Sequence, residues 1–328
     1  MKRKYIFLSI LPLVSAMIIA FVFWCHTKEQ QAQNEDYYKA FRDNYALYSP
    51  PIPESLSFAG EKVPLDVYYV REALDKELLV NVYWQSNILL LVKRAARYFP
   101  VIEPILKANN IPEDFKYLAV IESGLTNAVS PANAAGIWQF IKSTGLHYQL
   151  EINTEVDERY HLTKATQAAC QYLKNSYRMH GSWTAAAAAY NMGDGGFRRC
   201  STSQQTNQYW DLFLNAETAR YVYRILAIKL IFENPQKYGV KLRLKDLYPP
   251  IPTHTLTVDT SIANLMDFAR QQGVNYKVFK ECNPWLIAHS LNNKSHKSYQ
   301  IEIPDSKYMR YYALMEGVSS DSLYCGEK

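Results

Sequence analysis

The chain has 328 residues, of which 48% are hydrophobic, so it can bury a substantial core and can contain more than one domain. Its formal charge of +5 is mild, and no arginine-rich tract or nucleic-acid motif accompanies it, so nucleic acid is not an expected partner. The 26 tyrosines and 6 tryptophans are compatible with stacking on sugar faces, although core packing explains most aromatic residues in most proteins.

The N-terminus predicts export of the body of the protein. A basic cluster at residues 1–4 precedes an uncharged stretch from Tyr5 to Trp24, and the first acidic residue is Glu29. At about 1.5 Å per residue, the stretch can span a hydrocarbon core of about 30 Å. We therefore expect a signal-anchor or transmembrane segment over residues 1–26, with a cytoplasmic start. A cleaved signal peptide or a lipoprotein cysteine at Cys25 are the alternatives, and each of them also places the body outside the cytoplasm.

The five cysteines show neither CxxC nor metal-ligand spacing. In an exported protein, Cys170 could pair with Cys200. Cys282 could likewise pair with Cys325, and the sequence does not decide the connectivity. The odd number leaves at least one thiol without an intramolecular partner.

The middle of the chain is predicted to be all-helical. Residues 27–64 are polar and then punctuated by prolines, which is typical of a linker. From Leu65 onward apolar residues recur at helical spacing, and an all-α domain is predicted over residues 65–246. Its expected helices cover residues 78–98, 101–108, 112–124, 163–181, 182–190 and 216–232.

The last part of the chain has a different pattern. Three prolines follow Leu247, and residues 254–258 and 299–304 then alternate like strands on either side of two helical segments, 261–272 and 277–283. The sequence therefore predicts a small βααβ module over residues 247–328. The expected fold class is mainly α, with this α+β module at the C-terminus.

Glu122 is the best candidate for chemistry in the chain. Pro112 suits a helix start and Gly124 a helix end, so the segment between them is a predicted helix. Phe115, Leu118 and Glu122 fall at i, i+3 and i+7, which places the carboxylate at the end of an apolar stripe. A carboxyl group against apolar neighbours has a raised pKa, as a general acid needs near neutral pH.

Four short blocks around Glu122 occur in order along the chain. They are Glu122-Ser123, Ser130-Pro131 with residues 135–139, residues 188–193, and residues 217–222. They resemble the Glu-Ser pair and the Gly-x-x-Gln, Ala-Tyr-Asn-x-Gly and Glu-Thr-x-x-Tyr-Val blocks of lytic murein transglycosylases, most closely the membrane-bound D type. The resemblance covers roughly residues 66–232 and implies a lysozyme-like catalytic domain.

The resemblance implies a lyase that uses one carboxyl group. Glu122 would protonate the glycosidic oxygen between N-acetylmuramic acid and N-acetylglucosamine, and would then take the proton of the sugar's C6 hydroxyl as a 1,6-anhydro ring closes. An ordinary glycosidase needs two carboxylates. The next acids along the chain show no reason to act as nucleophiles, because they fall in a polar stretch that is expected to be a solvated loop: Glu151, Glu155, Asp157 and Glu158.

The resemblance also implies the residues that hold the substrate. Tyr190 would face the catalytic acid and bind the sugar or its N-acetyl group. Ser130 and Gln139 would line the other side of the groove. Ser123 would support Glu122, and Tyr221 would close the cleft. No cofactor and no metal are implied; the expected partners are peptidoglycan glycan strands and the membrane, with the catalytic domain in the periplasm of the cell envelope.

The C-terminal module resembles LysM, a small βααβ module that binds N-acetylglucosamine-containing glycans. The resemblance lies in the two strand segments, residues 262–269 and the Cys282-Asn283-Pro284 run. Glycan binding and a structural appendage are equally compatible with it. For the whole chain, the rivals of the lyase are a hydrolytic muramidase similar to goose-type lysozyme and a non-catalytic glycan-binding protein of the cell wall.

Overall fold

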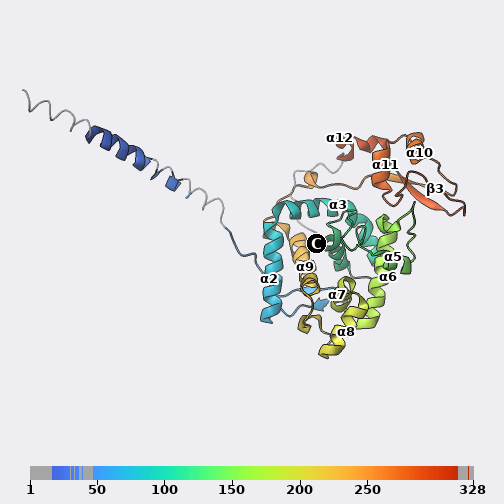
Figure 1. Cartoon of the computed structure of the whole chain (residues 1–328), viewed down its shortest axis with the longest axis horizontal. Coiled ribbons are helices and arrows are strands. Elements are labelled where there is room, and N and C mark those ends of the chain that lie inside the picture. The colour runs from blue at the N-terminus through green and yellow to red at the C-terminus, as the bar shows by residue number, and fades with distance from the viewer. Residues whose placement is uncertain are drawn as a thin grey trace, which may run out of the picture. The chain divides into compact units, whose positions relative to one another are not determined.

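The computed structural model describes residues 17–29, 31–32, 34–36, 39, 47–316 and 324. The chain divides into two compact units, Met1–Ser49 and Pro50–Lys328 (Figure 1). In the first unit, residues 17–29 are helical. None of the helices in the described part of the chain is both long and apolar enough to cross a bilayer. Most of the predicted anchor, residues 1–16, lies outside the described residues.

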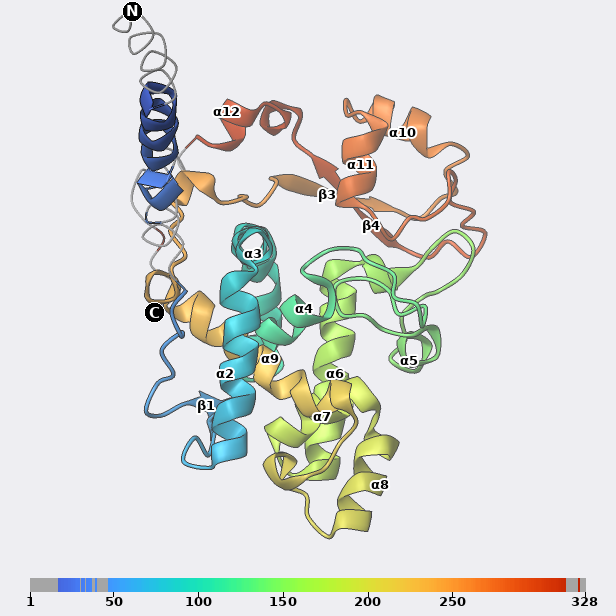
Figure 2. The same ribbon diagram turned by 60° about the vertical axis from the view of Figure 1, so that its left-hand side comes forward.

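The second unit is mostly helical, which confirms the predicted fold class. Its helical part contains α2 (Tyr68–Tyr83), α3 (Gln85–Ala108), α4 (Lys116–Ser123), α5 (Lys142–His147), α6 (Leu162–His180), α7 (Trp183–Met192), α8 (Asp194–Gln204) and α9 (Ala216–Glu233). Helix α9 packs against α2, α4 and α7, and α6 packs against α3 and α7. Figure 2 shows α4 near the middle of this arrangement.

The helix boundaries follow the local capping signals where these are strong. Ser182 begins α7 by accepting a hydrogen bond from the backbone N–H of Ala185, and Gly181 ends α6 in the left-handed conformation. The predicted break between residues 98 and 101 is wrong, because α3 continues through Pro100. The chain instead leaves the helical conformation at Trp84.

Burial explains why α3 tolerates two internal prolines. Each proline removes a backbone hydrogen bond from the helix and costs about 3 kcal/mol. Phe99, Ile102 and Leu106, which lie beside Pro100 and Pro104, are all buried in the core. Their transfer from water offsets the cost.

Residues 50–64, which the prolines suggest to be linker, pack onto the helical domain. Leu56, Phe58 and Val63 are buried, and a short antiparallel hairpin forms between β1 (Ser57–Phe58) and β2 (Glu61–Lys62). The Lys229 ammonium group also donates to the Ser57 carbonyl oxygen at 3.0 Å, a contact between distant positions that local composition does not reveal.

Glu61 in this hairpin caps the first turn of α7. Its carboxylate accepts hydrogen bonds from the Ser182 hydroxyl at 2.8 Å and from the backbone N–H groups of Trp183 at 2.6 Å and Thr184 at 2.9 Å. Because removal leaves N–H groups at a helix start without an acceptor, Glu61→Ala should lower the free energy of unfolding by about 2 kcal/mol. Urea denaturation measures this.

The matched control for that variant is Glu54→Ala. Glu54 lies on the same segment and is exposed. Its replacement should change the free energy of unfolding by less than about 0.5 kcal/mol. Equal losses in the two variants would show that the cap contributes nothing.

The C-terminal module has the predicted strand–helix–helix–strand order. It consists of β3 (Thr253–Val258), α10 (Leu265–Gln271), α11 (Tyr276–Cys282) and β4 (Tyr299–Pro304). The strands pair antiparallel, with Leu256 opposite Ile301. Asn283 of the Asn-Pro pair donates a side-chain hydrogen bond to the Glu302 carbonyl oxygen at 2.6 Å, and accepts one from its N–H at 2.9 Å. The Asn side chain therefore fixes the end of α11 against β4.

The suggested disulfide between Cys170 and Cys200 is not present, since both thiols are free. Cys170 is buried in the helical core, where it packs as a small apolar side chain. The other suggested pair involves Cys325, which lies outside the described residues.

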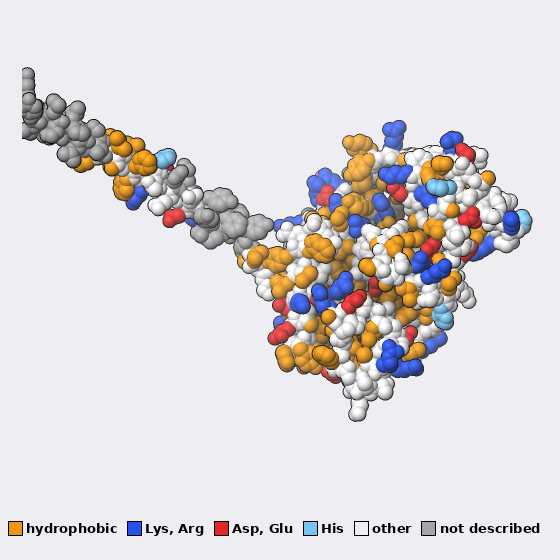
Figure 3. All heavy atoms as spheres, viewed as in Figure 1, with side chains coloured by type: hydrophobic (Ala, Val, Ile, Leu, Met, Phe, Trp, Pro, Cys, Tyr) orange, Lys and Arg blue, Asp and Glu red, His pale blue; other side chains and the backbone are white. Residues whose placement is uncertain are grey.

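Charges of both signs are interspersed on the face drawn in Figure 3. Apolar side chains lie singly or in small groups between them. This surface agrees with the mild net charge of the sequence.

Candidate active site

A cleft of about 600 Å³ opens beside the C-terminal end of α4. It is lined by side chains from α4, from the loop before α5, from α7 and from α9. Five of the six residues singled out in the sequence contribute to its walls: Glu122, Ser130, Gln139, Tyr190 and Tyr221. The fold thus brings together residues that are as much as 99 positions apart.

Glu122 occupies the last turn of α4. The helix ends at Ser123 because Gly124 adopts φ +61°, and its N–H still bonds the Val120 carbonyl oxygen. The carboxyl group of Glu122 accepts a hydrogen bond from the Tyr221 hydroxyl. Burial raises the pKa of Glu122 to about 7, while the Tyr221 hydrogen bond and the charge of Arg224 oppose the rise. The carboxyl group can therefore hold a proton near neutral pH and release it.

The raised pKa of Glu122 should make the free energy of unfolding depend on pH. Between the unfolded value of 4.5 and the folded value of about 7, the folded protein binds the proton more tightly, so stability decreases as the pH rises through this window. Glu122→Gln should then raise the free energy of unfolding at pH 8 by up to about 3 kcal/mol. Below pH 4.5 the two proteins should be equally stable.

Urea denaturation at pH 4 and pH 8 checks this prediction. The value of about 3 kcal/mol is an upper bound, because Glu122 lines a cleft and is only partly buried, so that solvent screens its charge. Glu54→Gln, on an exposed residue, is the control and should show no such pH dependence. A Glu122→Gln variant less stable than the wild type at pH 8 would contradict the prediction.

The two tyrosines of the cleft make different hydrogen bonds. Tyr221, which was expected to close the cleft, is 1% exposed and bonds Glu122 directly. Tyr190 donates its hydroxyl hydrogen bond to the Trp138 carbonyl oxygen at 2.7 Å, and its ring packs against Tyr172 and Phe140. The tyrosine hydroxyl that hydrogen-bonds the candidate acid is thus that of Tyr221.

Ser130 and Gln139 both shape the loop that forms one wall of the cleft. The Ser130 hydroxyl accepts from the Ala134 N–H at 3.1 Å. The Gln139 amide donates to the carbonyl oxygens of Ala128 at 2.9 Å and Gly136 at 2.8 Å, and its own backbone has φ +50°. The loop over residues 128–140 is therefore held by its own polar side chains.

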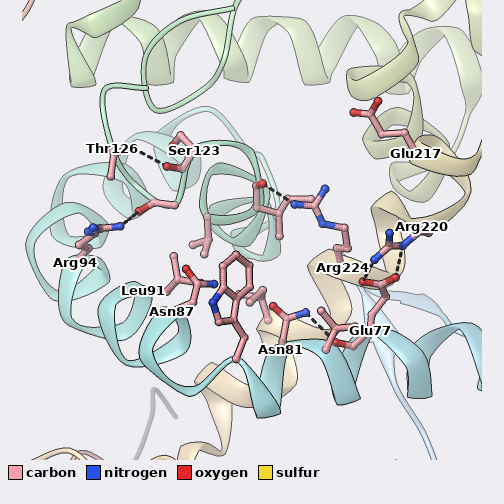
Figure 4. Close-up of a pocket in the computed structure, with 16 residues that line it drawn as sticks. Glu77, Asn81, Asn87, Leu91, Arg94, Ser123, Thr126, Glu217, Arg220 and Arg224 are labelled. Atoms are coloured by element: carbon pink, nitrogen blue, oxygen red, sulfur yellow. Dashed lines mark hydrogen bonds and ion pairs between the residues drawn. The ribbon is translucent and has the colours of Figure 1, made fainter. Parts of the chain in front are cut away.

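Ser123 faces away from the cleft. Its hydroxyl donates to the Ile137 carbonyl oxygen at 2.9 Å, which ties α4 to the wall loop. It lines a second pocket of about 470 Å³ that shares Ile121, Glu217 and Arg224 with the cleft. Figure 4 shows this pocket, with Arg94 on one side and Arg224 on the other.

The second pocket combines charged and apolar side chains. The Arg94 guanidinium donates to the Gly124 carbonyl oxygen at 3.0 Å, and Arg220 forms a two-point ion pair with Glu77 (Figure 4). Trp84, 59% exposed, adds an aromatic face. The cleft and this pocket together place charged side chains on both sides of the end of α4.

Three polar or charged residues that line the cleft, Asn191, Glu217 and Arg224, are among those not proposed from the sequence as site residues. Glu217 and Arg224 lie on α9 with Tyr221, at spacings of four and three residues that place all three on one helix face. The Arg224 guanidinium donates to the Ile121 carbonyl oxygen at 3.0 Å. Asn191 donates to the Glu217 carboxylate at 2.9 Å. Helical spacing from Tyr221 is the signal that could have identified Arg224.

The acids after Glu122 are not in a solvated loop, contrary to the sequence-based expectation. Asp157 and Glu158 are 5% and 2% exposed, and none of the four lines the cleft. Asp157 pairs with Arg159, and Glu158 pairs with Lys164. The polar composition of this segment reflects an interface with the C-terminal module, whose contacts are long-range.

Comparison with known families identifies the domain that contains the cleft. A model of the transglycosylase SLT domain matches residues 99–213. The chain contains an SLT domain. The soluble lytic transglycosylase C-terminal LysM-like domain matches residues 254–307, which cover the βααβ module. The mainly helical, lysozyme-like fold and the small two-stranded module predicted from the sequence are thereby confirmed.

Curated relatives resemble large parts of the chain. The chain is 32% identical over 244 residues, or 72% of its length, to membrane-bound lytic murein transglycosylase D of Escherichia coli strains K12 and O6:H1. It spans about half of those relatives, 52% of their length. It is also 27% identical over 150 residues to a putative tributyltin chloride resistance protein of Alteromonas sp. strain M-1, covering 45% of this chain and 70% of that one.

Proposed function

We propose that the chain is a peptidoglycan lytic transglycosylase. It cleaves the bond between N-acetylmuramic acid and N-acetylglucosamine without adding water and leaves 1,6-anhydro ends. The observation that carries the proposal is Glu122, a carboxyl group with a pKa of about 7 at the wall of the cleft in an SLT domain. The similarity to proteins named lytic murein transglycosylases supports it.

Glu122 acts first as an acid. Its proton moves to the glycosidic oxygen, the bond from that oxygen to C1 breaks, and the leaving sugar departs with a neutral hydroxyl. The substrate's own N-acetyl carbonyl stabilises the positive charge that develops at C1. The Tyr221 hydroxyl, which already bonds Glu122, and the nearby Arg224 stabilise the carboxylate that this step leaves behind.

Glu122 then acts as a base. Its carboxylate takes the proton of the C6 hydroxyl while O6 attacks C1, so the 1,6-anhydro ring closes and the acid is regenerated. The attacking group belongs to the substrate, so the second step is intramolecular and gains effective concentration. One carboxyl group with a pKa near the working pH serves both steps.

A hydrolytic muramidase is the second candidate, because Glu217 is another carboxylate in the cleft. Hydrolysis needs a carboxylate that activates water. The Glu217 carboxylate instead accepts from Asn191 and lies exposed at the edge shared with the second pocket. We therefore assign Glu217 to shaping the cleft edge.

Mass spectrometry of digested murein sacculi separates the two candidates. The lyase yields anhydro products that are lighter by one water than the products of hydrolysis, and Glu217→Gln should still yield them. Products with only reducing-end muramic acid would overturn the lyase proposal. Binding of sacculi with no product at all would favour a non-catalytic glycan-binding protein.

The cell envelope is the proposed location, with the N-terminal segment as a membrane anchor and the SLT domain on the periplasmic side. The basic cluster and the uncharged stretch up to Trp24 support the anchor, as do relatives that are named membrane-bound. The protein should remain in the membrane fraction after carbonate washing. Release of a shortened chain into the soluble fraction would indicate a cleaved signal peptide.

A further inference from the structure

One segment, residues 151–160, connects the C-terminal module to the helical domain. It leads from α5 to α6 and lies against the module in Figure 2. The Asp157 N–H donates to the Trp285 carbonyl oxygen at 2.8 Å, and the Ile287 N–H donates to the Glu155 carbonyl oxygen at 2.9 Å. Val156, between them, is 1% exposed and belongs to the module's own hydrophobic core. The segment is thus built into the module.

Side chains reinforce this docking. The Glu155 carboxylate accepts from the Ser290 hydroxyl at 3.2 Å and from the Asn292 N–H at 3.0 Å. The Glu151 carboxylate accepts from the Tyr299 hydroxyl at 3.0 Å. These contacts use the stretch of the module between α11 and β4, together with the start of β4. That stretch is therefore occupied by the protein's own chain.

The other side of the same segment holds the wall loop of the cleft. Arg159 donates to both carboxylate oxygens of Asp157, at 3.0 and 2.7 Å. Its remaining nitrogen donates to the carbonyl oxygens of Asn133 at 2.9 Å and Phe140 at 3.1 Å. These two residues bracket Ala134 and Gln139, which line the cleft. A single guanidinium thus fixes the loop at two points.

Asp157 joins the two sets of contacts. Its backbone N–H is bound to the module, and its carboxylate orients Arg159 by a pair of parallel hydrogen bonds. Both charges are largely excluded from water, with side chains 7% and 11% exposed. Loss of one partner would leave the charge of the other buried and unpaired. Removal of either Asp157 or Arg159 should therefore destabilise this part of the structure.

We propose that Arg159 is a positioning residue for the cleft, and that the C-terminal module holds it in place through Asp157 and Glu155. The module then forms part of the structure of the active site, in place of a separate glycan-binding appendage. The effect on activity rests on the proposed function. The effect on the loop does not, because the loop can be observed by itself.

Two variants of the full-length protein test whether the C-terminal module positions the loop over residues 128–140. One changes the contacts to the loop, and the other changes the contacts to the module. Arg159→Gln removes the bonds to the wall loop, and Glu155→Ala removes module contacts without touching the loop. In both, amide hydrogen exchange in residues 128–140 should become about tenfold faster or more. The kcat for sacculi should fall about 10- to 100-fold with KM changed less than about threefold, because the cleft loses its alignment.

Two further variants serve as controls. Arg159→Lys keeps the charge and one donor group, so it should restore part of the kcat and part of the loop protection if Arg159→Gln folds poorly. Arg270→Gln removes an arginine of the same module that is 80% exposed and pairs with Asp267 on its own helix, and should leave both readouts unchanged.

The outcomes distinguish the proposal from its alternatives. Unchanged exchange in residues 128–140 in both Glu155→Ala and Arg159→Gln would overturn it, whatever happens to activity. Faster exchange confined to the Arg159 variants would overturn the role of the module. If the wild-type protein makes no anhydro product, the proposed function fails, and the exchange measurement still decides whether the module positions the loop.

Discussion

Replacement of Glu122 by glutamine should lower the rate of glycan cleavage about 10²- to 10⁴-fold, the usual contribution of a general acid–base residue. Glutamine has the same shape but carries no proton to give to the glycosidic oxygen. It can still accept the hydrogen bond of Tyr221, so the local structure should persist. Release of soluble anhydro products from sacculi, followed by mass spectrometry, measures the loss.

A binding assay separates this chemical role from substrate recognition. Sedimentation with insoluble peptidoglycan should retain Glu122→Gln as well as it retains the wild type. Glu217→Gln is the matched control, because it makes the same substitution at the other cleft carboxylate and should keep activity within about tenfold. A Glu122→Gln variant with near wild-type turnover would remove Glu122 from the chemistry.

The parts of the fold that the sequence predicted are those with local signals. Ser182 and Gly181 mark the boundary between α6 and α7, and alternation marks β3 and β4. The packing of residues 50–64 and the docking of residues 151–160 could not be predicted in this way. Both depend on partners more than 100 positions away, such as Ser182 for Glu61 and Trp285 for Asp157.

For the candidate site, too, local sequence motifs predicted some features and long-range packing decided the others. The four sequence blocks brought Glu122, Ser130, Gln139, Tyr190 and Tyr221 to attention, and the fold places all of them at one cleft. The sequence could not show which tyrosine hydroxyl bonds Glu122. Tyr190 and Tyr221 belong to different helices, and the packing of these helices decides which hydroxyl reaches the carboxyl group. Their assignment to catalysis and binding stays a prediction that the variants above test.

Gly136→Ala should cost about 4 kcal/mol of stability and lower turnover about 10²-fold. Gly136 has φ +79°, which disfavours any residue with a Cβ by about 1–2 kcal/mol. A Cβ at this position would also lie 1.9 Å from the carbonyl oxygen of Arg159. That oxygen belongs to a backbone fixed by its side chain, so the loop must move, and overpacking of this kind costs about 1–3 kcal/mol more. Displacement of Gln139 would then misalign the cleft.

Gly181→Ala isolates the steric part of this effect. Gly181 has φ +74° with no atom within 4 Å of the position of a Cβ, so its replacement should cost only the backbone strain of about 1–2 kcal/mol. Urea denaturation of both variants gives the difference, and equal losses would show that contact with Arg159 does not constrain the loop. A larger loss of unfolding free energy in Gly136→Ala, with product formation impaired only in that variant, would explain why the Gly-x-x-Gln block needs a glycine. It is the point where the cleft wall meets the backbone of Arg159, with no space left for a side chain.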